Sequence, residues 1–403
     1  MPRPSRRDGW VALLVLAGAA AASAPARAGD DAATAAALVA ALPADGLTDI
    51  VLVDQPSRPD APRVRAVTHV AATPAGIKAV LLDPTHYRAL IPSLIESNAE
   101  GNAPVVVRWE LEVPIFNLSG RLAVRDQPNG VTFELFDGDF APGRLVFTAL
   151  PDARGGTALA IDAVLDIKRS SWLLRRIIKR SPAGEPAALA AAAYVALRAV
   201  ALRAEHPNDR FAWRARATPA PPPEWRPDPR PLATEALAPL RAQGVLALVA
   251  RQPNERLAGV AAAVVVRAAA ARVAAALRDP GTWRIFPGWS TIKPRPGPNG
   301  PGADVEDNLP LVDLDATWTA EPGPISRWTA TAGALQGARL GWTVFGTGAD
   351  TSAAVLSLYP RLEATGTVAR RFIAAEPLLE PGLALALTFV DAAATGVAFS
   401  TAR

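Results

Sequence analysis

The chain has 403 residues, a formal net charge of +4 and no cysteine. The absence of cysteine excludes disulfides, thiol catalysis, cysteine-ligated metal and a lipid anchor on an N-terminal cysteine. About +3 of the charge belongs to the first 28 residues, so the remainder carries no broad field for nucleic acid or anionic lipid.

The first 28 residues have the pattern of a cleaved export signal. Arg3, Arg6 and Arg7 give a basic start, residues 11–22 form an apolar run that is short for a bilayer span, and residues 26–28 form a small-x-small cleavage site. We therefore expect an exported, periplasmic protein whose mature chain begins near residue 29. A membrane anchor is the alternative, and the choice between the Sec and twin-arginine routes stays open.

The rest of the chain consists of two similar halves, offset by about 195 to 197 residues. The matching groups are Asp83-Pro84 with Asp279-Pro280, Val113-Pro114-Ile115 with Leu309-Pro310-Leu311, and Arg175-Arg176 with Arg370-Arg371. An offset this constant indicates a duplicated domain, because the units of a solenoid are only about 20–50 residues long. We predict one domain at 29–212, a proline-rich linker at 213–231 and a second domain at 232–403.

Each half has the same predicted order of elements. A short helix (34–42 and 234–242) leads to two strands, of which the second covers 64–70 and 260–266. A helix follows at 74–82 and 270–278, ended by the Asp-Pro pair. In the first half, strands are predicted around 109–113, 118–124, 131–135, 143–150 and 158–167, before a long helix at 185–205.

The strands of the first half alternate between apolar and polar residues. Trp109 and Leu111 alternate with Glu110 and Glu112, so one face of the sheet is apolar and the other is charged. Short turns between the strands predict antiparallel pairing. The sequence therefore predicts an α+β fold in which the long last helix covers the apolar face of an antiparallel sheet.

A family resemblance rests on the opening of each half. Thr73-Pro74, Asp83-Pro84, Tyr87 and Ile91-Pro92, with the matching Asp279-Pro280, Trp283 and Phe286-Pro287, resemble the START-like or SRPBCC superfamily, which includes ubiquinone-binding and polyketide cyclase proteins. The resemblance covers nearly all of both halves. It implies two helix-grip domains, each a curved antiparallel sheet wrapped around its long C-terminal helix with an apolar cavity between them.

Strand alternation predicts which side chains face that cavity. In the first half they are Trp109, Leu111, Val113, Leu122, Phe133, Phe147 and Ile161, together with Tyr194 of the last helix. In the second half they are Val305, Asp307, Leu309, Trp318, Trp328, Trp342 and Phe389. The alternative is that these side chains only fill a core. Asp307 is either a polar anchor in the second cavity or, after a shift of register, a solvent-facing residue.

Catalytic signals are sparse. His69, His86 and His206 are scattered in the first half, and the second half has no histidine. Their spacing matches no triad or metal site, and no glycine-rich phosphate loop follows a strand. We therefore assign no catalytic residue, no metal and no cofactor.

One segment has the composition of a membrane contact. Trp172, Arg175, Arg176, Lys179 and Arg180 combine an aromatic ring with four cations, which suits an anionic membrane surface. The alternative is that the aliphatic residues of this segment pack under the sheet while its cations cap a helix.

The sequence favours an exported protein that binds or carries a hydrophobic small molecule, such as a lipid, quinone, sterol or polyketide-like compound, without covalent chemistry. One alternative is an enzyme of the aromatase/cyclase type that acts on a hydrophobic substrate in the same pocket. Another is a structural or interaction module with filled pockets. Because the second half carries Trp318, Trp328 and Trp342, we expect its cavity to be smaller or closed. The oligomeric state stays open.

Overall fold

The computed structural model describes residues 28–54, 62–91, 93–101, 105–113, 116–152, 155–165, 183–209, 227–285, 290–298, 300–309, 312–323, 326–362 and 378–401. Residues 1–27 of the predicted export signal, most of the predicted linker and the predicted membrane-contact segment around Trp172 lie outside these ranges. The predicted domain limits, leader and membrane contact therefore stay predictions.

The first half contains eight strands and two long helices in the described residues. Its elements are α1 (Ala28–Ala41), β1 (Thr48–Asp54), β2 (Arg63–Val70), α2 (Pro74–Leu81), α3 (Tyr87–Leu90), β3 (Leu94–Glu100), β4 (Val105–Val113), β5 (Phe116–Gln127), β6 (Gly130–Gly138), β7 (Gly143–Pro151), β8 (Thr157–Val164) and α5 (Gly184–Glu205).

The second half repeats this order. Its elements are α6 (Ala238–Gln243), β9 (Gly244–Arg251), β10 (Leu257–Val266), α7 (Ala270–Arg278), β11 (Ser290–Gly297), β12 (Gly300–Leu309), β13 (Val312–Ala320), β14 (Ser326–Gly333), β15 (Arg339–Gly348), β16 (Thr351–Tyr359) and α9 (Leu379–Thr401). The helix predicted at 234–242 is shorter than expected, because 3₁₀ turns at Arg230–Ala233 and Glu235–Leu237 precede α6.

Local sequence explains where α2 begins and ends. Thr73 caps its first turn by accepting a hydrogen bond from the Gly76 amide at 3.1 Å, and Pro74 occupies a first-turn position where its missing N–H costs nothing. After the helix, the Asp83 carboxylate accepts from the Thr85 amide at 3.2 Å and starts the next turn. Beyond these caps, α2 contacts β6, β7 and α5, and α3 contacts β3.

The described strands form one continuous antiparallel sheet of 16 strands. Its order is β11-β12-β13-β14-β15-β16-β10-β9-β1-β2-β8-β7-β6-β5-β4-β3. The predicted α+β class and antiparallel pairing are confirmed. The joining of the halves through β1 and β9 is not anticipated by the sequence analysis.

The pairing of β1 with β9 is symmetric. Ile50 pairs with Leu248, and Val51 pairs with Ala247. At the repeat offset of about 197 residues, seen in Gln55 and Gln252, these two pairs exchange places. A local two-fold axis therefore passes between them, and each half extends outward from this axis with the same strand order.

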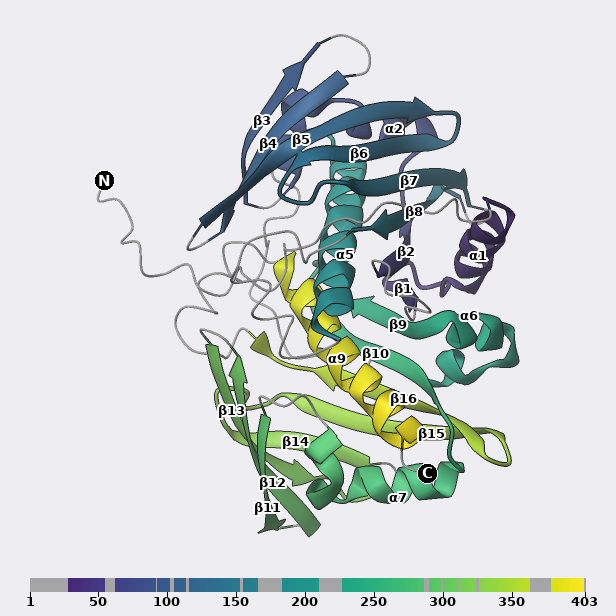
Figure 1. The fold of residues 1–403 in the computed structure, drawn as a ribbon. Coiled ribbons are helices and arrows are strands. Elements are labelled where there is room, and N and C mark those ends of the chain that lie inside the picture. The colour runs from purple at the N-terminus through teal and green to yellow at the C-terminus, as the bar shows by residue number, and fades with distance from the viewer. Residues whose placement is uncertain are drawn as a thin grey trace, which may run out of the picture.

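The central strands are covered on both faces. Helices α5 and α9 lie on one face, where α5 contacts β2 and β8 and α9 contacts β10 and β16, while α1 and α6 lie on the other (Figure 1). A second apolar cluster forms under α1 and α6 and includes Leu38, Leu240, Ile50 and Leu248. Burial on both faces explains why β1 and β9 read as nearly continuous apolar runs.

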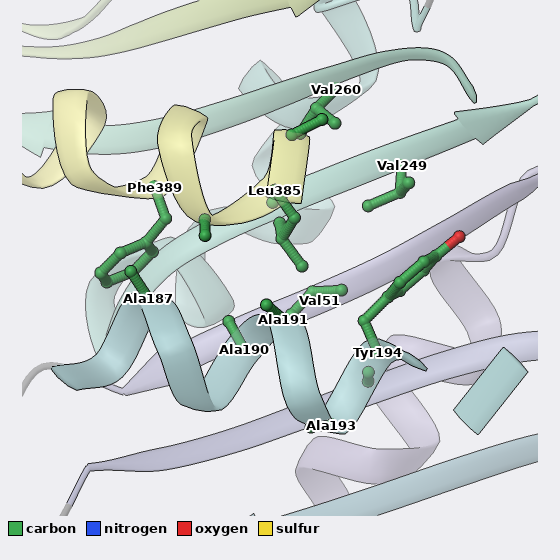
Figure 2. Packing of buried hydrophobic residues seen from close by; sticks show 14 of the residues in the cluster. Val51, Ala187, Ala190, Ala191, Ala193, Tyr194, Val249, Val260, Leu385 and Phe389 are labelled. Atoms are coloured by element: carbon green, nitrogen blue, oxygen red, sulfur yellow. The ribbon is translucent and has the colours of Figure 1, made fainter. Parts of the chain in front are cut away.

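Helices α5 and α9 also contact each other. Leu385 and Phe389 of α9 point toward Ala187, Ala190 and Ala191 of α5, whose small side chains allow close approach (Figure 2). Both helices are long and apolar enough to cross a membrane by length and composition, and most of each is buried inside the structure. One hydrophobic core therefore runs through both halves.

Candidate functional site

The candidate site is the inner face of the first half, where the sheet faces α5. Trp109 and Leu111 of β4, Phe133 of β6, Phe147 of β7 and Ile161 of β8 are buried there within the main apolar cluster. Leu122 of β5 is partly buried and packs against the same cluster. The predicted inward alternation is therefore present for these residues, while the side chain of Val113 lies outside the described residues. Their contact with a ligand stays a prediction.

The side chains of this face are buried from the middle of the sheet to its outer strands. Val64 of β2 and Ile161 of β8 are 0 % and 1 % exposed, whereas Trp109, Phe133 and Leu111 are 5 %, 7 % and 9 % exposed. Complete packing leaves side chains such as Val64 no accessible surface. Val107 of β4 and Val131 of β6 are also 0 % exposed, so the inner face is buried across its width.

Trp109 of this face has a buried polar group without a partner among the described residues. Its indole lies over Gly120 of the neighbouring strand, where an added Cβ would lie 2.9 Å from the ring. Its buried Nε1 has no hydrogen-bond acceptor among the residues that the structure describes. A buried donor without a partner costs about 1–3 kcal/mol. Buried polar groups of this kind are rare in native structures, so this N–H needs an explanation.

Phe140 covers the Trp109 indole. The two rings stack with centroids 5.5 Å apart and an interplanar angle of 13°. Phe140 lies in the turn between β6 and β7 with a φ of 85°, a left-handed conformation that is strained for a residue other than glycine. The stacking therefore coincides with a strained backbone, and sequence alternation could not detect this contact because Phe140 lies in a turn.

Tyr87 anchors the first half at the edge of this face. Its hydroxyl donates to the carbonyl oxygen of Leu81 at the end of α2, and burial followed by the nearby Asp83 carboxylate raises the pKa of the phenol well above its usual range. The matching Trp283 of the second half donates from Nε1 to the Leu277 carbonyl at 3.1 Å. Tyr87 and Trp283 thus make the same hydrogen bond in their two halves, to a carbonyl oxygen near the end of the preceding helix.

The second half carries larger aromatic side chains on its inner face. Trp283 packs edge-on against Trp328 at 4.5 Å between centroids, where the first half has Tyr87 and Phe133 at 5.9 Å. Trp328 and Trp342 are 1 % and 2 % exposed, and Trp318 is also buried. The side chain of Asp307 lies outside the described residues; its backbone pairs with Ser290 and Leu314.

A buried polar cluster connects the two halves beside this site. We call it the polar joint, and it consists of Asp49 of β1, Thr68 of β2, Tyr194 and Arg198 of α5, Arg251 of β9 and Glu255 of the β9–β10 turn. Asp49 is at its centre and is completely buried. Arg251 donates to both Asp49 oxygens, at 2.9 and 3.3 Å, and Thr68 donates at 2.6 Å.

Tyr194 belongs to this polar joint. The sequence predicts it as a residue of the pocket; its ring lies in the main apolar cluster, and its hydroxyl donates to Asp49 Oδ2 at 2.9 Å. Glu255 completes the connection, because its two oxygens accept from Arg251 at 2.7 Å and from Arg198 at 2.6 Å. The positive charges of two guanidinium groups therefore balance the negative charges of two carboxylates between the halves.

The electrostatics of the polar joint keep Asp49 ionised. Burial alone would raise the pKa of its carboxyl group, but the charges of Arg251 and Arg198 and the hydrogen bonds from Thr68 and Arg251 outweigh burial and hold the pKa below its usual 3.8. Burial and the Asp49 charge raise the pKa of Tyr194 far above its usual range, so the phenol remains a donor.

This pKa shift predicts how stability depends on pH. Since the folded-state pKa of Asp49 lies below its unfolded value near 3.8, its contribution is complete above that value and is lost as pH falls through the folded pKa. We expect Asp49→Asn to destabilise the protein strongly at pH 7 and progressively less below about pH 3.8. Urea unfolding of both proteins from about pH 7 to about pH 2.5 measures the difference. If the difference in the free energy of unfolding between the two proteins is constant over this range, the pKa of Asp49 is not lowered by folding.

The polar joint is not predicted by the periodic pattern of the sequence, although a signal for it exists. At positions that match Asp49, Tyr194 and Arg198, the second half has Leu246, Phe389 and Ala393. A position that is polar in one half and apolar in the other indicates a contact that only one half makes. Arg198 is an example, because it lies in a helix that is otherwise rich in alanine and leucine. The pairing of β1 with β9, which creates the contact, has no counterpart in local sequence.

The histidines form local contacts away from the inner face. His69 Nδ1 lies 3.1 Å from Asp152, and the exposed His86 contacts Asp83 within its own turn. Among the described residues, no group of three or more histidine, aspartate or glutamate side chains is arranged to hold a metal ion. Glu110 and Glu306 contact Asn117 and Lys293 on the outer face of the sheet.

No family model and no curated protein matches the chain. Similar solved structures include a protein of Thermus thermophilus, with 16% identity, a TM-score of 0.30, and coverage of 37% of this chain and 100% of that chain. A START superfamily protein of Mycobacterium smegmatis has 20% identity, a TM-score of 0.24, and coverage of 26% and 76%. The di-domain ARO/CYC StfQ from the steffimycin biosynthetic pathway has 13% identity, a TM-score of 0.26, and coverage of 82% and 99%.

START superfamily and di-domain aromatase/cyclase proteins are thus among the similar structures, the group that the sequence resembles. The TM-scores are low, and the strand order and contacts given above define the fold of this chain.

Proposed function

We propose that the first half binds a hydrophobic small molecule non-covalently on its inner face, between β4–β7 and α5, in the manner of a helix-grip domain. The observation that supports this most is the combination at Trp109 of a buried N–H without an acceptor among the described residues and a surface of inward apolar side chains around it. Apolar surroundings with very few polar groups are typical of sites for hydrophobic ligands.

The second half is proposed to be mainly structural. Trp283, Trp328 and Trp342 are almost completely buried on its inner face, so less volume remains for a ligand than in the first half. This assignment agrees with the expectation from the sequence that the second cavity is smaller or closed. The protein is proposed to act after export, with the segment around Trp172 to Arg180 contacting an anionic membrane during ligand exchange.

An enzyme of the aromatase/cyclase type is the alternative function. It requires acid and base groups that converge on the bound molecule. The inner-face residues named above are apolar apart from the Trp109 N–H and the Tyr87 hydroxyl, and that hydroxyl is bonded to the Leu81 carbonyl. Binding without chemistry is therefore the better-supported proposal.

The test is the affinity of the chain for a fluorescent apolar probe, such as 1-anilinonaphthalene-8-sulfonate. Trp109→Ala removes the largest side chain over the outer strands of the inner face, and we expect at least about tenfold weaker binding, since a factor of ten corresponds to about 1.4 kcal/mol. Circular dichroism and urea unfolding check that the variant is folded.

Phe136→Ala is the matched control. Phe136 lies on the outer face of β6, is 48 % exposed and packs against the Arg121 guanidinium at 5.4 Å. Its removal deletes an aromatic side chain without altering the inner face, so probe affinity should stay within about twofold of the parent chain. Unchanged affinity in a folded Trp109→Ala chain would place the site elsewhere.

A further inference from the structure

The turn between β9 and β10, residues 252–256, contacts both α5 and α9. Two consecutive side chains of the turn make these contacts. Glu255 Oε2 accepts from Arg198 Nη2 of α5 at 2.6 Å, and Arg256 Nε donates to Glu380 Oε2 in the first turn of α9 at 2.8 Å. One turn of the second half is therefore bonded to a helix of each half.

The backbone of this turn suits glycine or asparagine better than glutamate. Glu255 has a φ of 68°, in the left-handed region that is strained for most side chains. Its N–H donates to the Gln252 carbonyl at 2.9 Å, and the Gln252 N–H donates to the Arg256 carbonyl at 2.7 Å, so the turn is closed by its own hydrogen bonds. Strained residues that persist in a folded protein occur mostly at functional positions. Here the strained residue supplies the carboxylate that α5 contacts.

Burial makes both contacts sensitive to position. The side chains of Arg198, Arg256 and Glu380 are 1 %, 4 % and 2 % exposed. A shift of α5 or α9 by about an ångström would break a hydrogen bond of this length and leave a buried charge without its partner, which is costly. The positions of the two helices are therefore linked through the turn.

Helix α5 is fixed by the second half in two places. Its C-terminal part carries Arg198, which contacts Glu255, and its N-terminal part lies against Leu385 and Phe389 of α9 (Figure 2). The same helix forms one side of the proposed binding site. Networks of ion pairs between packed helices can carry coupling between separate parts of a protein.

We infer that the β9–β10 turn is a positioning element, through which the second half fixes α5 and so strengthens ligand binding on the inner face of the first half. Glu255 and Arg256 are positioning residues, since they act on the ligand through α5 and α9. The inference rests on the proposed function and adds a regulatory role for the second half. Because coupling is reciprocal, a ligand on the first half should also stabilise the first turn of α9.

The test uses two variants of the full chain. Glu255→Gly suits the left-handed backbone and removes the carboxylate. Arg256→Met combined with Glu380→Met removes the buried pair without leaving an unpaired charge and changes no residue of α5. If Glu255→Gly does not fold, the double variant decides alone.

Hydrogen exchange and titration of 1-anilinonaphthalene-8-sulfonate compare the variants with the parent. In both variants, the amides of α5 around Arg198 should exchange at least about threefold faster relative to those of β14, a strand that does not adjoin the turn. The probe should bind about three- to tenfold more weakly, because the ligand must then order a looser helix.

Glu321→Gln is the matched control. Glu321 also lies in a hairpin turn of the second half, is partly exposed and accepts from Thr329 Oγ1 at 2.6 Å within its own hairpin. Both α5 exchange and probe affinity should stay within about twofold of the parent in this variant.

A second readout follows the coupling in the opposite direction. Saturating probe should slow exchange in residues 379–383 of α9 by at least about twofold in the parent. This protection should be lost in Glu255→Gly. Equal protection in the parent and in Glu255→Gly would show that the turn does not carry the coupling.

The outcomes separate this inference from the proposed function. If the probe does not bind the parent chain, the proposed function fails and the inference fails with it. If the probe binds, and the folded variants keep the parent affinity and the parent exchange of α5, the proposed function stands and the inference is overturned.

Discussion

Replacement of Asp49 by alanine is expected to lower the free energy of unfolding by about 3–5 kcal/mol, because it leaves buried guanidinium groups without their carboxylate. Asp49 accepts hydrogen bonds from Arg251, Thr68 and Tyr194 and lies 4.0 Å from Arg198 Nε. Glu255 remains to pair with both arginines, but it is partly exposed and cannot enter the core. Urea unfolding at about pH 7 measures the loss.

Asp137→Ala is the control for this prediction. Asp137 is also a strand carboxylate paired with an arginine, since Arg121 Nη2 lies 2.8 Å from its Oδ2, but both side chains are about half exposed. Exposed ion pairs contribute only about 0–1 kcal/mol. Equal losses in the two variants would mean that water reaches the polar joint and screens its charges.

The polar joint has a second consequence, for the register of β1 and β9. Both strands are apolar on both faces, and a slip of one residue would exchange the two faces without exposing an apolar side chain to water. Asp49 meets Arg251 only in the observed register. We propose that the buried charges specify this register, a role that buried polar residues have in other folds.

The sequence predicted the elements of each half well because their signals are local. Alternation of apolar and polar residues along β4 to β8 reports one buried face, and Thr73-Pro74 and Asp83-Pro84 give the limits of α2. Strand β3, with the sequence LIESNAE, was missed because it lies at the edge of the sheet and is buried on neither face. Strand β11 was missed for the same reason, and its prolines are typical of a protected edge.

The candidate site was predictable only in part. Strand phase identified the inward side chains, including Trp109, Phe133 and Phe147, since alternation requires no knowledge of distant contacts. The stacking of Phe140 on Trp109 depends on a turn conformation, and the polar joint depends on pairing between segments 202 residues apart. Neither leaves a periodic pattern in the sequence.

The continuous sheet changes the expected behaviour of the separated halves. The repeat alone predicts that residues 29–212 and 232–403 each fold and unfold cooperatively. In the structure, separation leaves the seven residues of β1 without their β9 partners, exposes the α5 surface that packs against Leu385 and Phe389, and divides the polar joint. An unpaired strand with apolar residues on both faces is prone to aggregation.

We therefore expect that neither isolated half shows a cooperative urea transition, and that the full chain unfolds in a single transition followed equally by fluorescence and circular dichroism. The matched control is the full chain with a protease site inserted in the proline-rich linker. After cleavage its halves should remain associated and keep most of the parent stability, because the β1–β9 pairing, the α5–α9 contact and the polar joint do not depend on the linker. Two separate transitions in the full chain, each reproduced by one isolated half, would show that the joint contributes little and that the domains are independent. A single transition that is lost on separation of the halves, but retained after cleavage, would identify the joint as the element that makes the two copies one folding unit.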